Sequence, residues 1–321
     1  MVTGASKADL SLILVDASKG LQTQSRRHAI IASLLGIPHV VVVVNKIDLV
    51  DYSQDVFDRI RKEFIAFART LNFARVDFIP ASALEGDMVV DRGERLNWYQ
   101  GPTLLELLET TKAAESAAGD FRFPVQLVAR TKFGAKSEFR GYMGRIESGR
   151  VSVGDRIAVL PSGLEATVQD IVTLDGSLKT AAAKRSVTLL LDTQIDVSRG
   201  DLFAHVEDLP TVTNQITANL SWMSAQPLDA SRRYLIKHTT QSVRVQLEGI
   251  DYRLDVNTLL RETGVSTFKL NDIGRVRLKT LRPLIVDAYR ANRATGSFIL
   301  IDEVTNQTVA AGMILGEFGD D

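Results

Sequence analysis

Four consecutive residues, Asn45, Lys46, Ile47 and Asp48, combine side chains that can recognise a flat heterocycle. The Asp48 carboxylate can accept hydrogen bonds from paired N–H donors, and guanine presents such a pair on its ring nitrogen and exocyclic amine. Adenine presents no such pair, so this chemistry discriminates between the purines. The stem of Lys46 can lie along the face of a base, and Asn45 can tie the loop together and reach the base edge. The sequence therefore predicts guanine recognition here.

The apolar run before this motif, Val40 to Val44, predicts a strand buried on both faces, as in a parallel sheet. Ligands of such sheets bind at the carboxyl ends of the strands. A further predicted strand, Val76 to Pro80, is followed by Ser82, Ala83 and Leu84, which we expect to join the base site. Motifs of this kind at consecutive strand ends are typical of GTP-binding proteins, in which a backbone N–H of the second loop meets the guanine carbonyl. The alternative is that the acid of the first motif only caps a turn or helix.

The sequence lacks the residues that usually hold the phosphates of a nucleotide. A glycine-rich loop, G-x-x-x-x-G-K-[ST], wraps the phosphates in GTPases and places a hydroxyl on magnesium. No Gly-Lys pair and no Asp-x-x-Gly, the usual sensor of the terminal phosphate, occur in the chain. Because these elements normally precede the segment that begins here at Met1, we expect a chain with the base-recognising residues and without the phosphate-holding ones.

The composition is that of an ordinary globular protein, with 45% hydrophobic and 24% charged residues. The net charge of −1 provides no global basic field, so nucleic acid is not an expected partner. The absence of cysteine excludes disulfides and cysteine metal sites. No apolar run approaches the roughly 20 residues that span a bilayer, and the N-terminus lacks a signal pattern. These features predict a cytoplasmic protein that does not enter a membrane.

Strand and helix patterns divide the chain into an α/β part, residues 1–112, and two all-β parts, residues 121–207 and 211–317. The repeated β–α units predict a doubly wound parallel sheet, and the short, glycine-punctuated strands predict two β-barrels. The α/β part is expected to contain strands Leu10–Asp16, His39–Val44 and Val76–Pro80, with helices Gln22–Leu35, Ser53–Leu71 and Leu104–Leu108. The expected barrel strands are Val125–Ala129, Gly141–Ile146, Arg156–Leu160, Ala166–Val172, Val187–Leu191, Gln215–Trp222, Val243–Leu247, Gly274–Leu281 and Ser297–Ile301.

Acidic residues and serines are dispersed, and the sequence predicts no catalytic residue and no metal ligand in this chain. Ser148 and Ser162 precede glycines in turn contexts, outside any G-x-S-x-G elbow. The loop from Tyr289 to Gly296 is polar and basic, and it predicts a solvated turn, with a partner or phosphate contact as the alternative.

An α/β domain with this Asn-Lys-x-Asp motif, followed by two β-barrels, resembles the translational GTPase superfamily, with elongation factor Tu as type member. The chain looks more specifically like the large subunit of bacterial sulfate adenylyltransferase, almost from end to end. The stretches that carry this resemblance are Met1–Ser6, Leu49–Tyr52, Arg122–Gln126, Phe139–Tyr142, Ser198–Asp201 and Thr308–Met313. The fold class that it implies is α/β plus all-β, with part of a P-loop GTPase domain followed by two β-barrels.

The resemblance also implies a function. The family subunit binds and hydrolyses GTP with magnesium, and it partners a small catalytic subunit that adenylylates sulfate with ATP in sulfate assimilation and cysteine biosynthesis. Carried over to this chain, the guanine contacts are Asn45, Lys46, Asp48, Ser82 and Ala83. The phosphate loop and the magnesium ligand have no counterpart, so hydrolysis by this chain alone is not expected.

Two other interpretations of the sequence stay open. One is a translation-factor-like GTPase that carries RNA, against which the near-neutral charge argues. The other is a non-catalytic protein that only docks on a partner through its barrels. An upstream phosphate loop in the reading frame would exclude the second interpretation.

Overall fold

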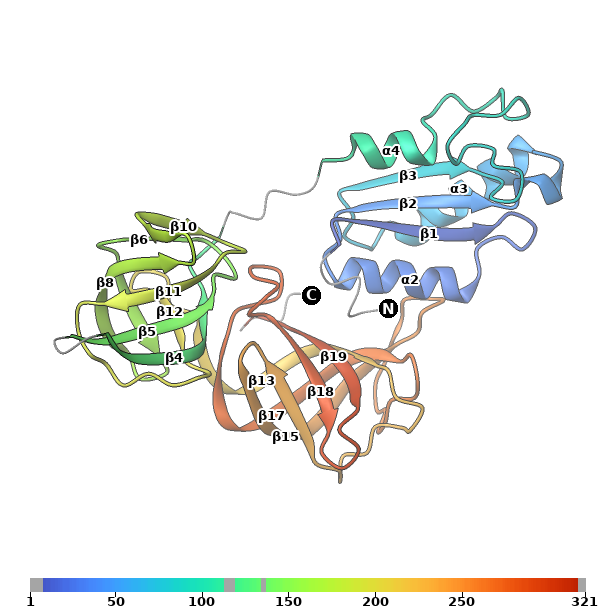
Figure 1. Ribbon diagram of the computed structural model, residues 1–321. Coiled ribbons are helices and arrows are strands. Elements are labelled where there is room, and N and C mark those ends of the chain that lie inside the picture. Colours follow the sequence, from blue (N-terminus) through green and yellow to red (C-terminus); the bar gives the residue numbers. More distant parts are fainter. Residues whose placement is uncertain (1–7, 113–118, 134–136, 317–321) are drawn as a thin grey trace. The chain divides into compact units, whose positions relative to one another are not determined.

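A computed structural model describes residues 8–112, 119–133 and 137–316 of the chain (Figure 1). The stretch Met1–Ser6 and most of the small-residue segment after Lys112 lie outside the described residues. The chain divides into two compact units: Met1–Ala114 with Asp255–Leu260, and Glu115–Leu254 with Arg261–Asp321. The first unit contains the α/β part, and the second contains both barrels.

The α/β part is built on a parallel sheet, as the sequence predicted, and its strand order is β1-β2-β3 (Figure 1). Residues His39 to Val44 are all buried, which confirms a strand covered on both faces. Helix α3 begins at its N-cap Ser53, whose hydroxyl accepts from the Val56 N–H, but it ends at Ala68 and does not reach Leu71. The elements are β1 (Leu10–Asp16), α2 (Thr23–Leu34), β2 (His39–Asn45), the 3-10 helix η1 (Ile47–Val50), α3 (Gln54–Ala68), β3 (Arg75–Pro80) and α4 (Leu104–Thr110).

Strand β1 forms an edge of the sheet within the described part of the chain. Its residues Ile13 and Val15 are 1% exposed, whereas Leu12 and Leu14, which point to the other face, are 37% and 61% exposed. One face of this strand is therefore packed in the core, and the opposite face presents leucines to solvent.

Within the described residues, both barrels are closed rings of six strands, with three short additional strands in the first barrel and one in the second. In the first barrel the order β11-β5-β4-β12-β7-β8 is closed by pairing of β11 with β8, and in the second β14-β18-β19-β13-β17-β15 is closed by pairing of β14 with β15. The first barrel has β4 (Phe123–Phe133), β5 (Ser137–Arg145), β6 (Arg150–Ser152), β7 (Arg156–Leu160), β8 (Leu164–Thr173), β9 (Gly176–Leu178), β10 (Thr180–Ala182), β11 (Ser186–Leu191) and β12 (Leu202–His205). The second has β13 (Thr211–Trp222), β14 (Tyr234–His238), β15 (Gln241–Leu254), β16 (Arg261–Glu262), β17 (Ile273–Val286), β18 (Ser297–Asp302) and β19 (Thr308–Ile314).

Two strands of the second barrel are much longer than the sequence predicted. Strands β15 and β17 each contain 14 residues, and their pairing shifts register near Gly249. Strand β17 also continues past Pro283, where its pairing with β13 is interrupted between Thr213 and Gln215. Such irregularities break the alternation of apolar and polar residues and allow a proline inside a strand. The strands predicted from that alternation therefore ended before the observed strands do.

The loop from Tyr289 to Gly296 is a turn that is only partly solvated, since Arg290 and Ala291 are exposed while both ends of the loop are packed. Thr295 is fully buried, and the Asn292 side chain donates to the Ser148 hydroxyl of the first barrel at 2.6 Å. The contact that the loop makes is therefore within the chain, between the two barrels.

A buried ion pair joins the barrels beside this loop. Arg122, which is 2% exposed, donates from Nε and Nη2 to the two carboxylate oxygens of Asp287, both at 2.9 Å. Its Nη1 donates to the carbonyls of Phe121 at 3.0 Å and Asp208 at 2.7 Å. Because a planar guanidinium matches a carboxylate in this bidentate arrangement, the pair fixes orientation as well as distance.

Candidate functional site

The loops that follow β2 and β3 are held together by backbone hydrogen bonds at the carboxyl edge of the sheet. The Ala81 N–H donates to the Val44 carbonyl at 2.9 Å, and the Ile47 N–H donates to the Ala81 carbonyl at 3.2 Å. These bonds continue the pairing of the strands beyond their ends. The sheet therefore places the two sequence motifs side by side, where ligands of parallel sheets bind.

Asn45 connects the two loops through its side chain. Its Oδ1 accepts from the Lys46 N–H at 2.8 Å and from the Ala83 N–H at 3.0 Å. One amide oxygen thus fixes a turn in its own loop and reaches across to the neighbouring loop, which restricts both backbones before any ligand binds.

Asp48 and Ser82 make a second link between the loops. The Ser82 hydroxyl donates to Asp48 Oδ1 at 2.6 Å and accepts from the Glu85 N–H at 3.2 Å. Ser82 is fully buried, whereas Asp48 is half-buried. Among the described residues, every hydrogen bond to the Asp48 side chain goes to Oδ1, so Oδ2 stays available to a donor from a ligand.

The side chain of Lys46 is fixed by an ion pair with Asp16, a residue that the sequence did not indicate as part of the site. The backbone of Lys46 has a φ of 60°, which is uncommon for a residue with a Cβ, and its Nζ donates to Asp16 Oδ2 at 2.8 Å. Asp16 is the last residue of β1, and its Oδ1 accepts from the N–H and hydroxyl of Ser18. The hydrogen bond from Lys46, followed by that from Ser18, lowers the pKa of Asp16 to about 2. The sequence feature that could have indicated Asp16 as a site residue is its position at the end of a predicted strand.

Ala83 and Leu84 form the exposed tip of the second loop, with Leu84 83% exposed. The structure brings Asn45, Asp48, Ser82 and Ala83 into direct hydrogen-bonded contact, and Leu84 is not part of that network.

A second cluster of polar side chains, formed around Arg95, packs against the loop that contains Ser82. The Arg95 guanidinium lies 4.6 Å from the ring centroid of Tyr52, and its Nη2 is 3.2 Å from Asp87 Oδ2 and 3.2 Å from Glu85 Oε2. The Asp87 carbonyl accepts from the Ser82 N–H at 3.1 Å. Burial, then the carboxylate of Asp87, raises the pKa of Tyr52 to about 12, so this phenol stays neutral. Sequence analysis missed this cluster because its members are common residue types without fixed spacing.

Candidate metal ligands do not cluster among the described residues. These residues contain no group of three His, Cys, Asp or Glu side chains that could hold a metal ion. None of the helices in the described ranges is long and apolar enough to cross a membrane. At the joined loops, the unengaged Asp48 Oδ2 can accept a hydrogen bond from a donor-bearing ligand.

Comparison with known families matches both ends of the chain. Residues 1–115 match the model of the elongation factor Tu GTP binding domain. Residues 215–315 match the model described as GTP-eEF1A C-terminal domain-like. These matches agree with a GTPase-type α/β domain that precedes barrels.

Curated relatives cover almost the whole chain. Proteins named sulfate adenylyltransferase subunit 1 from Francisella tularensis, Laribacter hongkongensis and Alteromonas mediterranea are 45%, 47% and 44% identical to it. The alignments cover 98%, 98% and 100% of this chain and 66%, 65% and 67% of the relatives. The chain thus spans about two thirds of the length of these proteins.

Solved structures support the fold alone. Crystal structures of sup35 complexed with GMPPNP and with GDP each have a TM-score of 0.55 and 23% sequence identity. They cover 97% and 98% of this chain, and 79% and 80% of theirs.

Proposed function

Because this chain belongs to the family of sulfate adenylyltransferase subunit 1, we propose that it is the GTP-binding subunit of a two-subunit sulfate adenylyltransferase. The complete enzyme would convert ATP and sulfate to adenylyl sulfate and pyrophosphate, coupled to GTP hydrolysis. The relatives are named as subunit 1, which supports the existence of a partner subunit, and we propose that this partner carries the adenylyl transfer. The cytoplasmic location stays a prediction from the sequence.

The guanine base would bind at the joined loops. Asp48 Oδ2 would accept from the donor edge of guanine, and the exposed tip at Ala83 would lie against the guanine carbonyl. The stem of Lys46, held by Asp16, would cover one face of the base. The observation that carries this proposal is that Asn45 and Asp48 each hydrogen-bond to the loop of the neighbouring strand, so that both loops form one preformed surface.

The sequence contains no G-x-x-x-x-G-K-[ST] phosphate loop, and we assign none of the described residues to the phosphates. No cluster of candidate metal ligands is present among them, and we assign no magnesium ligand in this chain. We therefore derive no step of GTP hydrolysis from its residues, and we attribute to this chain the recognition of the base.

The test uses the longest natural form of the protein, purified with and without its nucleotide-transferring partner. We expect sulfate-dependent release of pyrophosphate from ATP only when both subunits are present, and a faster release when GTP is added. Adenylyl sulfate formed by the isolated protein would contradict the two-subunit assignment. If GTP binds but the rate of pyrophosphate release does not change, the protein would be a docking partner whose GTP binding is not coupled to adenylyl transfer.

A further inference from the structure

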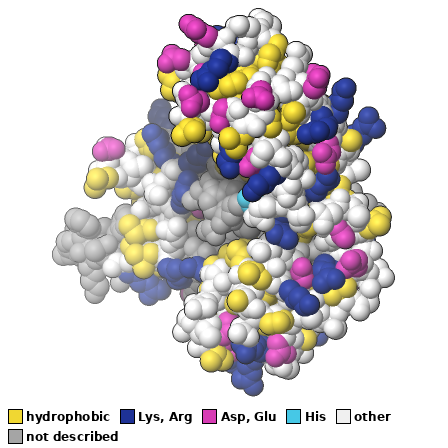
Figure 2. Space-filling view, turned by 90° about the vertical axis from the view of Figure 1, so that its right-hand side faces the viewer, with side chains coloured by type: hydrophobic (Ala, Val, Ile, Leu, Met, Phe, Trp, Pro, Cys, Tyr) yellow, Lys and Arg dark blue, Asp and Glu magenta, His cyan; other side chains and the backbone are white. Residues whose placement is uncertain are grey.

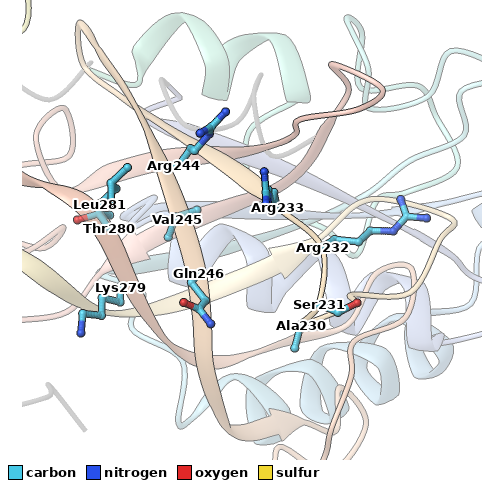
Figure 3. Close-up of a pocket in the computed structure, with 10 residues that line it drawn as sticks. All are labelled: Ala230, Ser231, Arg232, Arg233, Arg244, Val245, Gln246, Lys279, Thr280 and Leu281. Atoms are coloured by element: carbon cyan, nitrogen blue, oxygen red, sulfur yellow. The ribbon is translucent and has the colours of Figure 1, made fainter.

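The outer face of the second barrel carries basic side chains around an open cavity, and none of the residues that line this cavity belongs to the proposed guanine site. The cavity has a volume of about 480 Å³ and is lined by the turn before β14 and by β15 and β17 (Figure 3). Its basic lining residues are Arg232, Arg233, Arg244 and Lys279. The net charge of the chain is −1, and basic and acidic side chains are interspersed on the face in Figure 2, so a local basic group is a distinct feature.

The strand register places three of the lining side chains in one row. Gln246 on β15 is the cross-strand partner of Lys279 on β17, and Arg233 directly precedes Tyr234, the partner of Val245. Tyr234 and Val245 are buried, so their neighbours point outward. Figure 3 shows Gln246 between Arg233 and Lys279. We call Arg233, Gln246 and Lys279 the basic row; its ends are separated by two strand spacings, about 9.5 Å.

The cations at the two ends of the basic row differ from the other basic residues of the cavity. Arg244 pairs with Glu303 at 2.7 Å, and Arg232 pairs with Asp302 at 3.1 Å. Arg233 and Lys279 are exposed, and neither has an acidic partner within 4 Å among the residues that the structure describes. Glu303 and Asp302 are thus already engaged, and the two ends of the basic row have no acidic partner within 4 Å among the described residues.

An exposed apolar side chain borders the row. Leu281 lies two residues beyond Lys279 on the same outer face of β17, and it is 74% exposed. A ligand that fits this surface therefore combines negative charge with an apolar group, since each would find its complement within one side-chain length.

We propose that the basic row and Leu281 bind an acidic segment of a partner protein. Backbone N–H groups, which form many phosphate sites, are engaged in the sheet along β15 and β17 and do not add to this surface. A polyproline II segment places the side chains of residues i and i+3 on one side about 9.3 Å apart, which matches the ends of the basic row. Glutamates at that spacing would pair with Arg233 and Lys279, and an apolar residue between them would contact Leu281. This proposal does not depend on guanine binding.

The probe is a short, fluorescently labelled peptide of repeating Glu-Leu-Pro units, titrated against the full chain by anisotropy. Its control peptide carries Gln in place of Glu. The test variant is Arg233→Glu/Lys279→Glu. The matched control is Lys237→Glu/Lys269→Glu, which makes the same change of charge at exposed lysines of the same barrel that do not line the cavity. Thermal melting shows whether each variant is folded.

We expect binding of the Glu peptide that weakens with salt, since the Debye length shortens to about 8 Å at 0.15 M ionic strength. The test variant should reduce affinity by about tenfold or more, as interfacial charge reversals do, and Leu281→Gln should reduce it less. The control variant should keep most of the affinity. Equal losses in both double variants, no binding of the Glu peptide, or stronger binding of polyphosphate or RNA than of the peptide would each overturn the proposal.

Discussion

Replacement of Arg122 by methionine should uncouple and destabilise the two barrels. The change keeps much of the side-chain length but removes every donor of a guanidinium that is 2% exposed. It leaves the Asp287 carboxylate, 12% exposed, without its cation, and it leaves the carbonyls of Phe121 and Asp208 without a donor. Thr295 still donates to Asp287, so one hydrogen bond to the carboxylate survives.

The size of the expected loss in unfolding free energy follows from the burial of the ion pair. Loss of one partner of a buried ion pair costs about 3–5 kcal/mol, because an uncompensated charge stays in the interior. For a unit of roughly 200 residues, each kcal/mol lowers Tm by about 2–4 °C, so a fall of about 6–20 °C is expected. The double variant Arg122→Met/Asp287→Leu removes both charges and should recover part of the lost free energy of unfolding. The interaction energy of the double-mutant cycle should be at least about 1 kcal/mol.

The assay is urea unfolding followed by the fluorescence of Trp222, which is 1% exposed in the second barrel. The chain has two tryptophans, so a Trp98→Phe background leaves Trp222 as the single indole. The control variant is Arg156→Met, which breaks a surface pair with Glu165 whose side chains are 67% and 50% exposed. Exposed pairs contribute about 0–1 kcal/mol. If Arg122→Met costs no more than this control, the argument that the buried pair holds the barrels together is refuted.

Three further predictions concern the base site, a buried histidine and the sheet edge. Asp48→Asn, in the longest natural form of the protein, should weaken GTP by about 1–3 kcal/mol and favour xanthosine nucleotides, because an amide donates where guanine also donates; unchanged GTP affinity in calorimetry would contradict the site. His238 is buried and its Nε2 donates to the Thr295 carbonyl at 2.7 Å, and burial lowers its pKa below 6.5. Barrel stability should therefore be full above pH 6.5 and fall as the pH drops below it, since the unfolded chain binds the proton more readily; a His238→Gln variant with the same pH profile would exclude this cause. Leu14→Lys on the exposed face of the edge strand should reduce aggregation without a shift in barrel unfolding, because an edge charge opposes pairing between chains; unchanged light scattering would count against it.

The strands of the α/β part were predictable because their signal is local. Strand β1 has the predicted bounds, Leu10–Asp16, and β2 extends one residue past the predicted His39–Val44. A strand buried on both faces needs apolar residues at every position, and five consecutive valines satisfy that need without reference to the rest of the chain. The adjacency of the two loops was likewise predictable, since parallel strands end at the same edge.

Contacts between distant residues were not predictable in this way. Arg122 and Asp287 are separated by 165 positions, and neither has a neighbouring pattern that indicates the other. Asp16 was recognised as a strand residue but not as the partner of Lys46, because a single acid at a strand end has many possible roles. Strand β14, Tyr234–His238, was also missed, since its short alternation is convincing only when β15 and β18 are known to lie on either side.

Asn45 and Asp48 connect the loop after β2 to the loop after β3 at two points. This double connection has a consequence for which part of a nucleotide would determine selectivity. Since these loops are already fixed to each other, the base would meet a rigid template, and little conformational entropy would be lost on binding. The free-energy difference between guanine and adenine would then be set at the base alone and would be the same for a nucleoside as for its triphosphate. Affinity and selectivity would be separable quantities in this protein, the first governed by whatever holds the phosphates and the second by a surface that the sheet edge assembles by itself.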